Sequence, residues 1–72
     1  MPDHDLLTSL GKRIRKLRLK RGWTQVVMAE QIGIDRSFLA DVERGKRNIS
    51  IINLDLIAKG LETSLSKLLS RI

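Results

Sequence analysis

Lysines and arginines are the residues of this 72-residue sequence whose types and spacing point most clearly to a ligand. Residues 12–21 contain seven lysines and arginines and no acidic residue. A second polar group follows a glycine and consists of Lys46, Arg47 and Asn48. Side chains of these types bind phosphate oxygens, and an arginine can also donate two hydrogen bonds to a guanine. Together with a formal net charge of +6, these groups predict a polyanionic ligand.

Catalytic and metal-binding residue types are poorly represented in the chain. His4 is the single histidine, cysteine is absent, and no two carboxylates share a predicted helix face beside a cleft. We therefore expect a protein that is not an enzyme and that has no metal, no cofactor and no small-molecule effector. The absence of cysteine is compatible with a reducing compartment. Because no signal peptide or membrane span of ~20 apolar residues is present, we expect a cytoplasmic location without a membrane partner.

Apolar residues recur at three- and four-residue spacing along most of the chain, and this spacing predicts helices. The first helix is expected over residues 6–21, with an inward stripe formed by Leu7, Leu10, Ile14 and Leu17. Residues 1–5 contain no periodic apolar residue and predict a short disordered lead. Residues 6–72 are expected to form one all-α domain, because 72 residues are too few for two hydrophobic cores.

Four shorter helices are expected after the first. Each follows a side chain that can cap a helix N-terminus, and these side chains are Thr24, Asp35, Ser50 and Ser64. Glycines at 33 and 45 are expected to end the second and third helices. The expected inward residues are Met28, Ala29 and Ile32 in the second helix, Leu39 and Val42 in the third, Ile51, Leu54, Ile57, Ala58 and Leu61 in the fourth, and Leu65, Leu68 and Leu69 in the fifth. The predicted fold is a compact five-helix domain.

Two short helices joined by a tight glycine-containing turn and followed by a basic loop are typical of helix-turn-helix proteins. Residues 24–48, TQVVMAEQIGIDRSFLADVERGKRN, resemble the Cro and repressor-like (XRE-type) family. The family pattern runs Thr/Ser-Gln, Ala, Gly, a polar stretch and then Glu-x-Gly-Lys/Arg. The similarity extends from Leu10 to about Leu69, and residues 35–50 and 56–62 are similar to controller proteins of restriction-modification systems.

This resemblance implies a phage repressor-like domain that regulates transcription. Such a protein would bind a pseudo-palindromic operator in double-stranded DNA as a homodimer, through a recognition helix at residues 36–44. Arg36, Ser37 and Ala40 match the family positions that face base edges, and Asp41 lies beside them. Arg36 suits a guanine, and the methyl group of Ala40 could contact a thymine methyl. Asp41 could accept a hydrogen bond from a cytosine amine, orient Arg36 or face solvent.

The resemblance also implies contacts to the DNA backbone. Gln25 matches a glutamine at the start of the first motif helix, where a side chain and a helix N-terminus meet a phosphate. Lys46, Arg47 and Asn48 suit the phosphates beside the groove. We expect Phe38 to contact a sugar or a thymine methyl at the groove edge, with a place in the core as its alternative.

Arg18 and Glu43 match a family pair in which an arginine of the first helix meets a glutamate at the end of the recognition helix. We expect this ion pair to orient Arg18, partly buried, near a phosphate. Glu43 is then structural, because removing it would leave a buried charge without a partner.

Two pairs of apolar residues depart from the family pattern. Ile52 and Leu56 lie outside the core stripe of the fourth helix with a spacing of four, which predicts a second buried face and a homodimer interface. The alternative is scattered exposed hydrophobic residues. Val26 and Val27 occupy positions that are usually polar or acidic. The sequence assigns no role to them.

Two other functions are compatible with the sequence. The same fold serves as the antitoxin of a toxin-antitoxin pair, which would bind a toxin through its C-terminal helices. A more remote hypothesis is a protein of the membrane surface that uses its basic first helix. The operator sequence, the regulated genes and the choice between activation and repression are not specified by the sequence.

Overall fold

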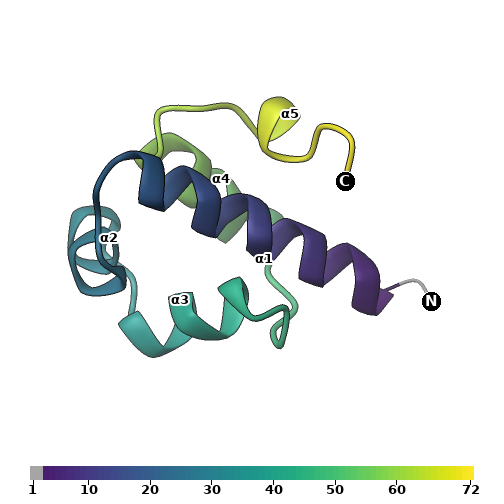
Figure 1. Ribbon diagram of the computed structural model, residues 1–72, viewed down its shortest axis with the longest axis horizontal. Helices are drawn as coiled ribbons and strands as arrows, with labels where there is room; N and C mark the ends of the chain where they lie inside the picture. The colour runs from purple at the N-terminus through teal and green to yellow at the C-terminus, as the bar shows by residue number, and fades with distance from the viewer. Residues whose placement is uncertain (1–2) are drawn as a thin grey trace.

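The computed structural model describes the backbone of residues 3–72 and the side chains of residues 6–72. These residues form five helices, α1 (Asp3–Lys20), α2 (Gln25–Ile32), α3 (Arg36–Glu43), α4 (Ile51–Gly60) and α5 (Leu65–Leu68). Figure 1 shows α1 running along the molecule, with α3 on one side of it, α2 beyond its C-terminal end and α5 near the C-terminus of the chain. The all-α prediction is confirmed over the part of the chain that is described.

The helix boundaries follow the predicted caps closely. The hydroxyl oxygens of Thr24, Ser50 and Ser64 each accept a hydrogen bond from the backbone N–H three residues later, at 3.0–3.1 Å. Asp35 occupies the expected N-cap position of α3 but makes no such side-chain bond. At the C-terminal end of α3, Arg44 is the cap and not the last helical residue, so the recognition helix is one residue shorter than predicted.

The N-terminal residues differ from the predicted disordered lead. We expected α1 to begin at Leu6, whereas its backbone is helical from Asp3. Met1 and Pro2 lie outside the described residues, so the prediction for that part of the lead has no structural counterpart. The apolar spacing identifies the part of α1 that packs against the core, and the backbone hydrogen bonds of a helix do not require that spacing at its ends.

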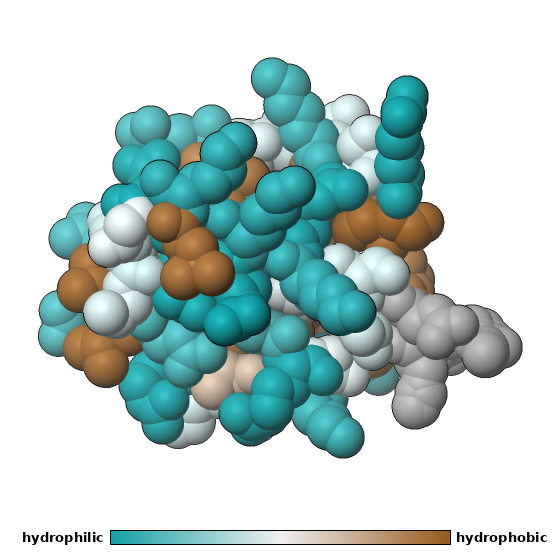
Figure 2. Space-filling view, in the orientation of Figure 1, coloured by the Kyte–Doolittle hydropathy of each residue, from teal (hydrophilic) through white to brown (hydrophobic). Residues whose placement is uncertain are grey.

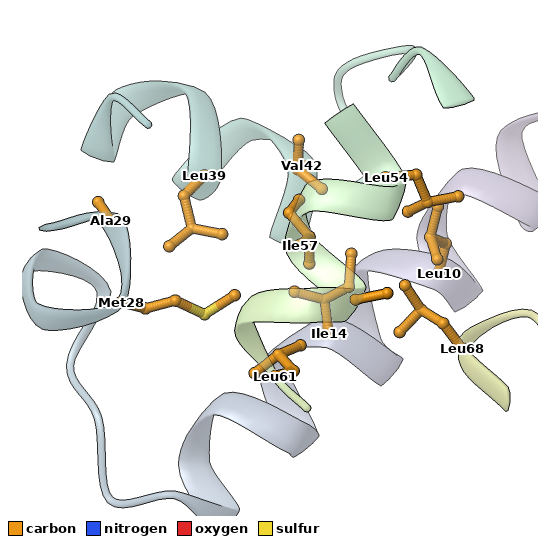
Figure 3. Packing of buried hydrophobic residues seen from close by; sticks show 11 residues of the cluster. Leu10, Ile14, Met28, Ala29, Leu39, Val42, Leu54, Ile57, Leu61 and Leu68 are labelled. Carbon is orange, nitrogen blue, oxygen red and sulfur yellow. The ribbon is translucent and has the colours of Figure 1, made fainter. Parts of the chain in front are cut away.

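The core gathers side chains from all five helices. Figure 3 shows the inward residues of α1, α2, α3 and α4 converging on one cluster, with Leu68 of α5 closing one end. Ile14, Met28, Leu39, Ile57 and Leu68 are its largest fully enclosed members. Because α1 supplies Leu10 and Ile14 to this core, its apolar stripe is not available to a lipid surface.

Two residues predicted to point inward are exposed. Ile51 is the first residue of α4 and lies ahead of the core stripe, so its side chain faces solvent. Leu69 follows the last residue of α5, which is a single helical turn, and it is also exposed. Both predictions were wrong for the same reason, since both residues lie at a helix terminus, and a helical period identifies the inward face only where the helix itself packs on the core.

Gly11 allows α1 and α3 to approach closely. A Cβ atom at this position would lie 2.5 Å from the carbonyl oxygens of Val42 and Glu43. Any side chain would therefore force the two helices apart. No described helix is long and apolar enough to cross a membrane. The face of the molecule in Figure 2 is mostly hydrophilic, with separate apolar patches.

Candidate nucleic-acid interface

Helix α3 is held against α1 and α2 by a short turn and by core packing. Gly33 ends α2 in the left-handed conformation (φ 82°), and its N–H donates to the carbonyl of Ala29. Leu39 and Val42 anchor α3 in the core, as predicted. The opposite side of α3 faces solvent, and the chain therefore presents one short, rigidly mounted helix on its surface.

A bidentate ion pair locks α1 to the C-terminal end of α3. The Nε of Arg18 donates to Glu43 Oε2 at 2.7 Å, and Nη2 donates to Glu43 Oε1 at 2.9 Å. Their side chains are 7% and 3% exposed. The hydrogen bonds that Arg18 donates to Glu43, together with the negative charge of Glu43, raise the pKa of Arg18, although burial opposes this effect. The predicted structural pair is therefore present.

Arg18 has no exposed guanidinium to offer a phosphate. Its Nη1 donates to the carbonyl of Trp23 at 2.8 Å, so every nitrogen of the guanidinium has a partner within the protein. The predicted backbone contact of Arg18 is thus corrected, because its burial leaves it a structural role alone.

Gln25 links this buried pair to the surface of α3. Its Nε2 donates to Glu43 Oε1 at 3.1 Å, and its Oε1 accepts from Arg36 Nη1 at 3.3 Å. The amide therefore bridges the glutamate that fixes α1 and the arginine predicted to contact a base. Gln25 lies at the N-terminus of α2, as expected for a phosphate contact, and it also orients Arg36 in the free protein.

The predicted base-contacting residues divide into exposed and buried ones. Arg36 and Ser37 are exposed on the first turn of α3. Ala40 is 4% exposed, so its methyl group presents almost no surface to a thymine methyl. We correct that part of the prediction, because Ala40 shares the inward side of α3 with Leu39.

Asp41 contacts arginines other than the one expected. Its carboxylate forms an ion pair with Arg44 and a longer one, 3.8 Å, with Arg47. It therefore does not orient Arg36. Arg47 in turn lies 5.1 Å above the ring of Phe38, a cation–π distance. Phe38 is half-buried and packs against the core, in line with the alternative interpretation, and its contact with DNA stays a prediction.

The loop after α3 is fixed to α1. Gly45 has a positive φ of 72°, and a Cβ atom there would lie 2.8 Å from the Cα of Thr8. This close approach places Lys46, Arg47 and Asn48, which are all exposed, beside the end of α3. The polar group identified in the sequence thus adjoins the recognition helix.

A shallow cleft shows which cations of α1 lie near α3 and the loop that follows it. It is lined by Thr8, Lys12, Arg15, Gln25, Glu43, Arg44 and Lys46. Lys12 and Arg15 were not singled out as site residues, because a run of seven cations around a helix does not show which of them point toward α3. Only the packing of α1 on α3 makes that distinction.

Comparison with known families decides the class of the protein. Residues 14–68 match the helix-turn-helix family HTH_3. The chain belongs to this family. It is accordingly a DNA-binding regulator and not an enzyme, as the sequence predicted, and the resemblance to the XRE-type family is confirmed.

Several HTH_3 relatives are controllers of restriction-modification systems. The control protein C.MunI from Mycoplasma is 40% identical over 70 residues, which cover 96% of this chain and 95% of that protein. The solved structure of the controller C.AhdI from Aeromonas hydrophila superposes with a TM-score of 0.81 at 39% identity, over 89% of this chain and 96% of that one.

A further solved structure contains DNA. It is the controller C.Esp1396I, a tetramer in complex with its natural 35 base-pair operator. It is similar to this chain with a TM-score of 0.80 and 40% identity, and the match covers 88% of this chain and 83% of that one.

The HTH_3 domain also carries apolar residues on the outside of α4. Ile52 is 78% exposed, Leu56 is partly exposed, and the neighbouring Ile51 is exposed as well. Ile52 and Leu56 fall outside the buried stripe, as the sequence predicted, whereas Ile51 was predicted to point inward. Val26 and Val27 are exposed on α2, and no contact in the structure explains their apolar character.

Proposed function

We propose that this protein is a transcription regulator of the restriction-modification controller type, which binds a pseudo-palindromic operator as a homodimer. The observation that carries the proposal is helix α3 with its exposed first turn, tied to α1 by a buried ion pair and bordered near its C-terminal end by a cleft lined with cations. The similar controllers C.MunI, C.AhdI and C.Esp1396I support the subgroup.

The exposed side chains suggest how the contacts are divided. Arg36 would leave the Oε1 of Gln25 and donate to the O6 and N7 of a guanine, while Ser37 bonds to a base or a phosphate. The freed Gln25 amide and the N-terminus of α2 would then meet a phosphate. Asp41 stays within the protein as the partner of Arg44 and Arg47.

The backbone contacts would come from the loop after α3. Lys46 and Asn48 are exposed beside the cleft and suit adjacent phosphates. Arg47, stacked on Phe38, reaches a phosphate at the groove edge while Phe38 presents its exposed edge to a sugar. Because the ligand is genomic DNA, the proposed location is the cytoplasm.

The exposed apolar residues of α4 supply the proposed dimer interface. Ile51, Ile52 and Leu56 would be covered by the same residues of a second copy, in a twofold contact. Such a dimer places two recognition helices about 34 Å apart, one turn of DNA, on the two halves of the operator. The tetrameric assembly of C.Esp1396I on its operator supports oligomeric binding.

A selection from random duplexes tests this function. The parent protein should enrich a two-half sequence with one turn between half-site centres. Arg36→Ala should lose discrimination at one base position in each half, a loss of about 1–3 kcal/mol for that base. Arg47→Ala is the matched control. It should weaken binding to all sequences equally, and it should reduce the slope of log affinity against log salt concentration by about one.

Two results would contradict the proposal. A parent protein that enriches no sequence is not a specific regulator. An Arg36→Ala variant that selects the same operator with unchanged preference at every base would remove α3 as the recognition helix.

A further inference from the structure

One face of α1 carries lysines and an arginine that neither pack in the core nor take part in the ion pairs. Lys12, Arg15, Lys16, Leu19 and Lys20 are exposed and line an open groove along the helix. Residues three and four apart lie on the same side of a helix, so these five form a continuous surface. We call them the α1 basic face.

The cations of the α1 basic face have no acidic partner among residues 6–72. The ion pairs of those residues use Arg18, Arg21, Arg44, Arg47 and Lys59, and none of them includes a member of this face. Like charges at three- and four-residue spacing repel one another and weaken the helix. An anionic partner would remove this repulsion, so the face is complementary to a negatively charged ligand.

Leu19 distinguishes between the possible anionic ligands. Its side chain is 52% exposed and lies among the four cations. DNA phosphates offer a leucine no apolar surface. An acidic amphipathic helix offers carboxylates at three- and four-residue spacing together with an apolar side chain on the same face. The residue composition therefore favours a protein ligand.

The position of the face also sets three of its five residues apart from the DNA surface. Lys12 and Arg15 border the cleft that contains Gln25 and Lys46, whereas Lys16, Leu19 and Lys20 do not line that cleft. We propose that the α1 basic face binds an acidic amphipathic helix of another protein, beside the DNA surface and while DNA is bound. This goes beyond the proposed regulatory function, since it assigns a second macromolecular partner.

A synthetic peptide tests the proposal directly. The probe is an end-blocked helix of about 16 residues, with glutamates and one leucine on a single face. Its binding to the intact protein is measured by fluorescence anisotropy, with and without operator DNA. We expect saturable binding that DNA does not abolish, weakened about tenfold by combined Lys16→Gln and Lys20→Gln and about fivefold by Leu19→Ser.

The chain contains matched control positions. Leu6 lies on the same helix and is 51% exposed, so Leu6→Ser should change peptide affinity less than about twofold. Lys59→Gln removes a lysine from α4 and should have an equally small effect. Because every substituted side chain is exposed, circular dichroism should show unchanged helix content in all variants.

Three outcomes would overturn the proposal. The first is no saturable binding of the peptide to the folded parent protein. The second is that all variants bind the peptide as tightly as the parent protein, or that a peptide with serine in place of its leucine binds as tightly as the original peptide. The third is that DNA displaces the peptide and that the variant with Lys16→Gln and Lys20→Gln also binds DNA more weakly. These two results together would make the α1 basic face part of the DNA surface. The peptide assay without DNA is independent of operator selection, so failure of one proposal is distinguishable from failure of the other.

Discussion

At the scale of single residues, one hydrogen-bond network connects the buried ion pair to the predicted recognition residue. Glu43 accepts hydrogen bonds from Arg18 and from Gln25, and Gln25 accepts one from Arg36. The chain of contacts therefore runs from the enclosed side of α1 to the exposed start of α3. A change at Glu43 should first affect folding, whereas a change at Arg36 should affect binding alone.

We expect Glu43→Gln to lower the free energy of unfolding by about 3–5 kcal/mol, because the buried Arg18 charge loses its counter-ion. Urea unfolding followed by circular dichroism measures the loss. Asp55→Asn is the control, since it breaks the exposed pair with Lys59 and should cost at most about 1 kcal/mol.

The single variant could be too unstable to fold, and a double variant keeps the prediction testable. Arg18→Met combined with Glu43→Leu replaces both charges by apolar side chains, so it should be more stable than Glu43→Gln. A double variant no more stable than the single one would mean that the unpaired charge is not the cause.

At the scale of helices, two contacts decide how α1 is placed. Gly11 lets the backbone of α3 approach α1, and Arg13 holds α5 against the other side. Arg13 donates to the carbonyls of Lys67, Leu68 and Ser70 at 2.8–3.3 Å. A residue of the basic run thus serves the fold and not the ligand.

Gly11→Ala should destabilise the protein by about 1–3 kcal/mol, because the new methyl group would overlap backbone carbonyls that cannot rotate away. Helix propensity alone favours alanine by about 1 kcal/mol and predicts the opposite sign. Gly60→Ala provides the comparison, since its methyl would meet the flexible side chain of Ile32 and should cost less. Thermal unfolding of the two variants checks the order.

Arg13→Ala should loosen α5 without unfolding the domain. Loss of three charge-assisted hydrogen bonds should raise hydrogen exchange of the amides at residues 68–70 at least about tenfold. Arg15→Ala, which removes an exposed arginine of the same helix, should leave these amides unchanged. Equal exchange in both variants would show that α5 is held by Leu68 alone.

At the scale of the whole molecule, 72 residues bury a small core and leave apolar residues of α4 exposed. A domain of this size is only modestly stable as a monomer. Association of two copies through Ile51, Ile52 and Leu56 would add stability that depends on protein concentration.

We therefore expect the unfolding temperature of the parent to rise with protein concentration. Leu56→Lys should abolish that dependence and halve the mass measured by sedimentation. Val26→Lys, at an exposed apolar position on α2, should leave the mass unchanged. A Leu56→Lys variant with the parent mass would place the dimer interface elsewhere.

The sequence by itself determined the helical class, most helix boundaries and the family, and the family resemblance implied the Arg18–Glu43 pair. The first three depend on local patterns, because cap residues, the helical period and the motif lie within short stretches of chain. Tertiary structure decided that Ala40 is buried, that Asp41 contacts Arg44 and Arg47, and that Arg13 holds α5. It also selected Lys12 and Arg15 from the basic run as neighbours of α3. The physical reason is that a sequence pattern places side chains around one helix, whereas the packing of helices decides which of them meet.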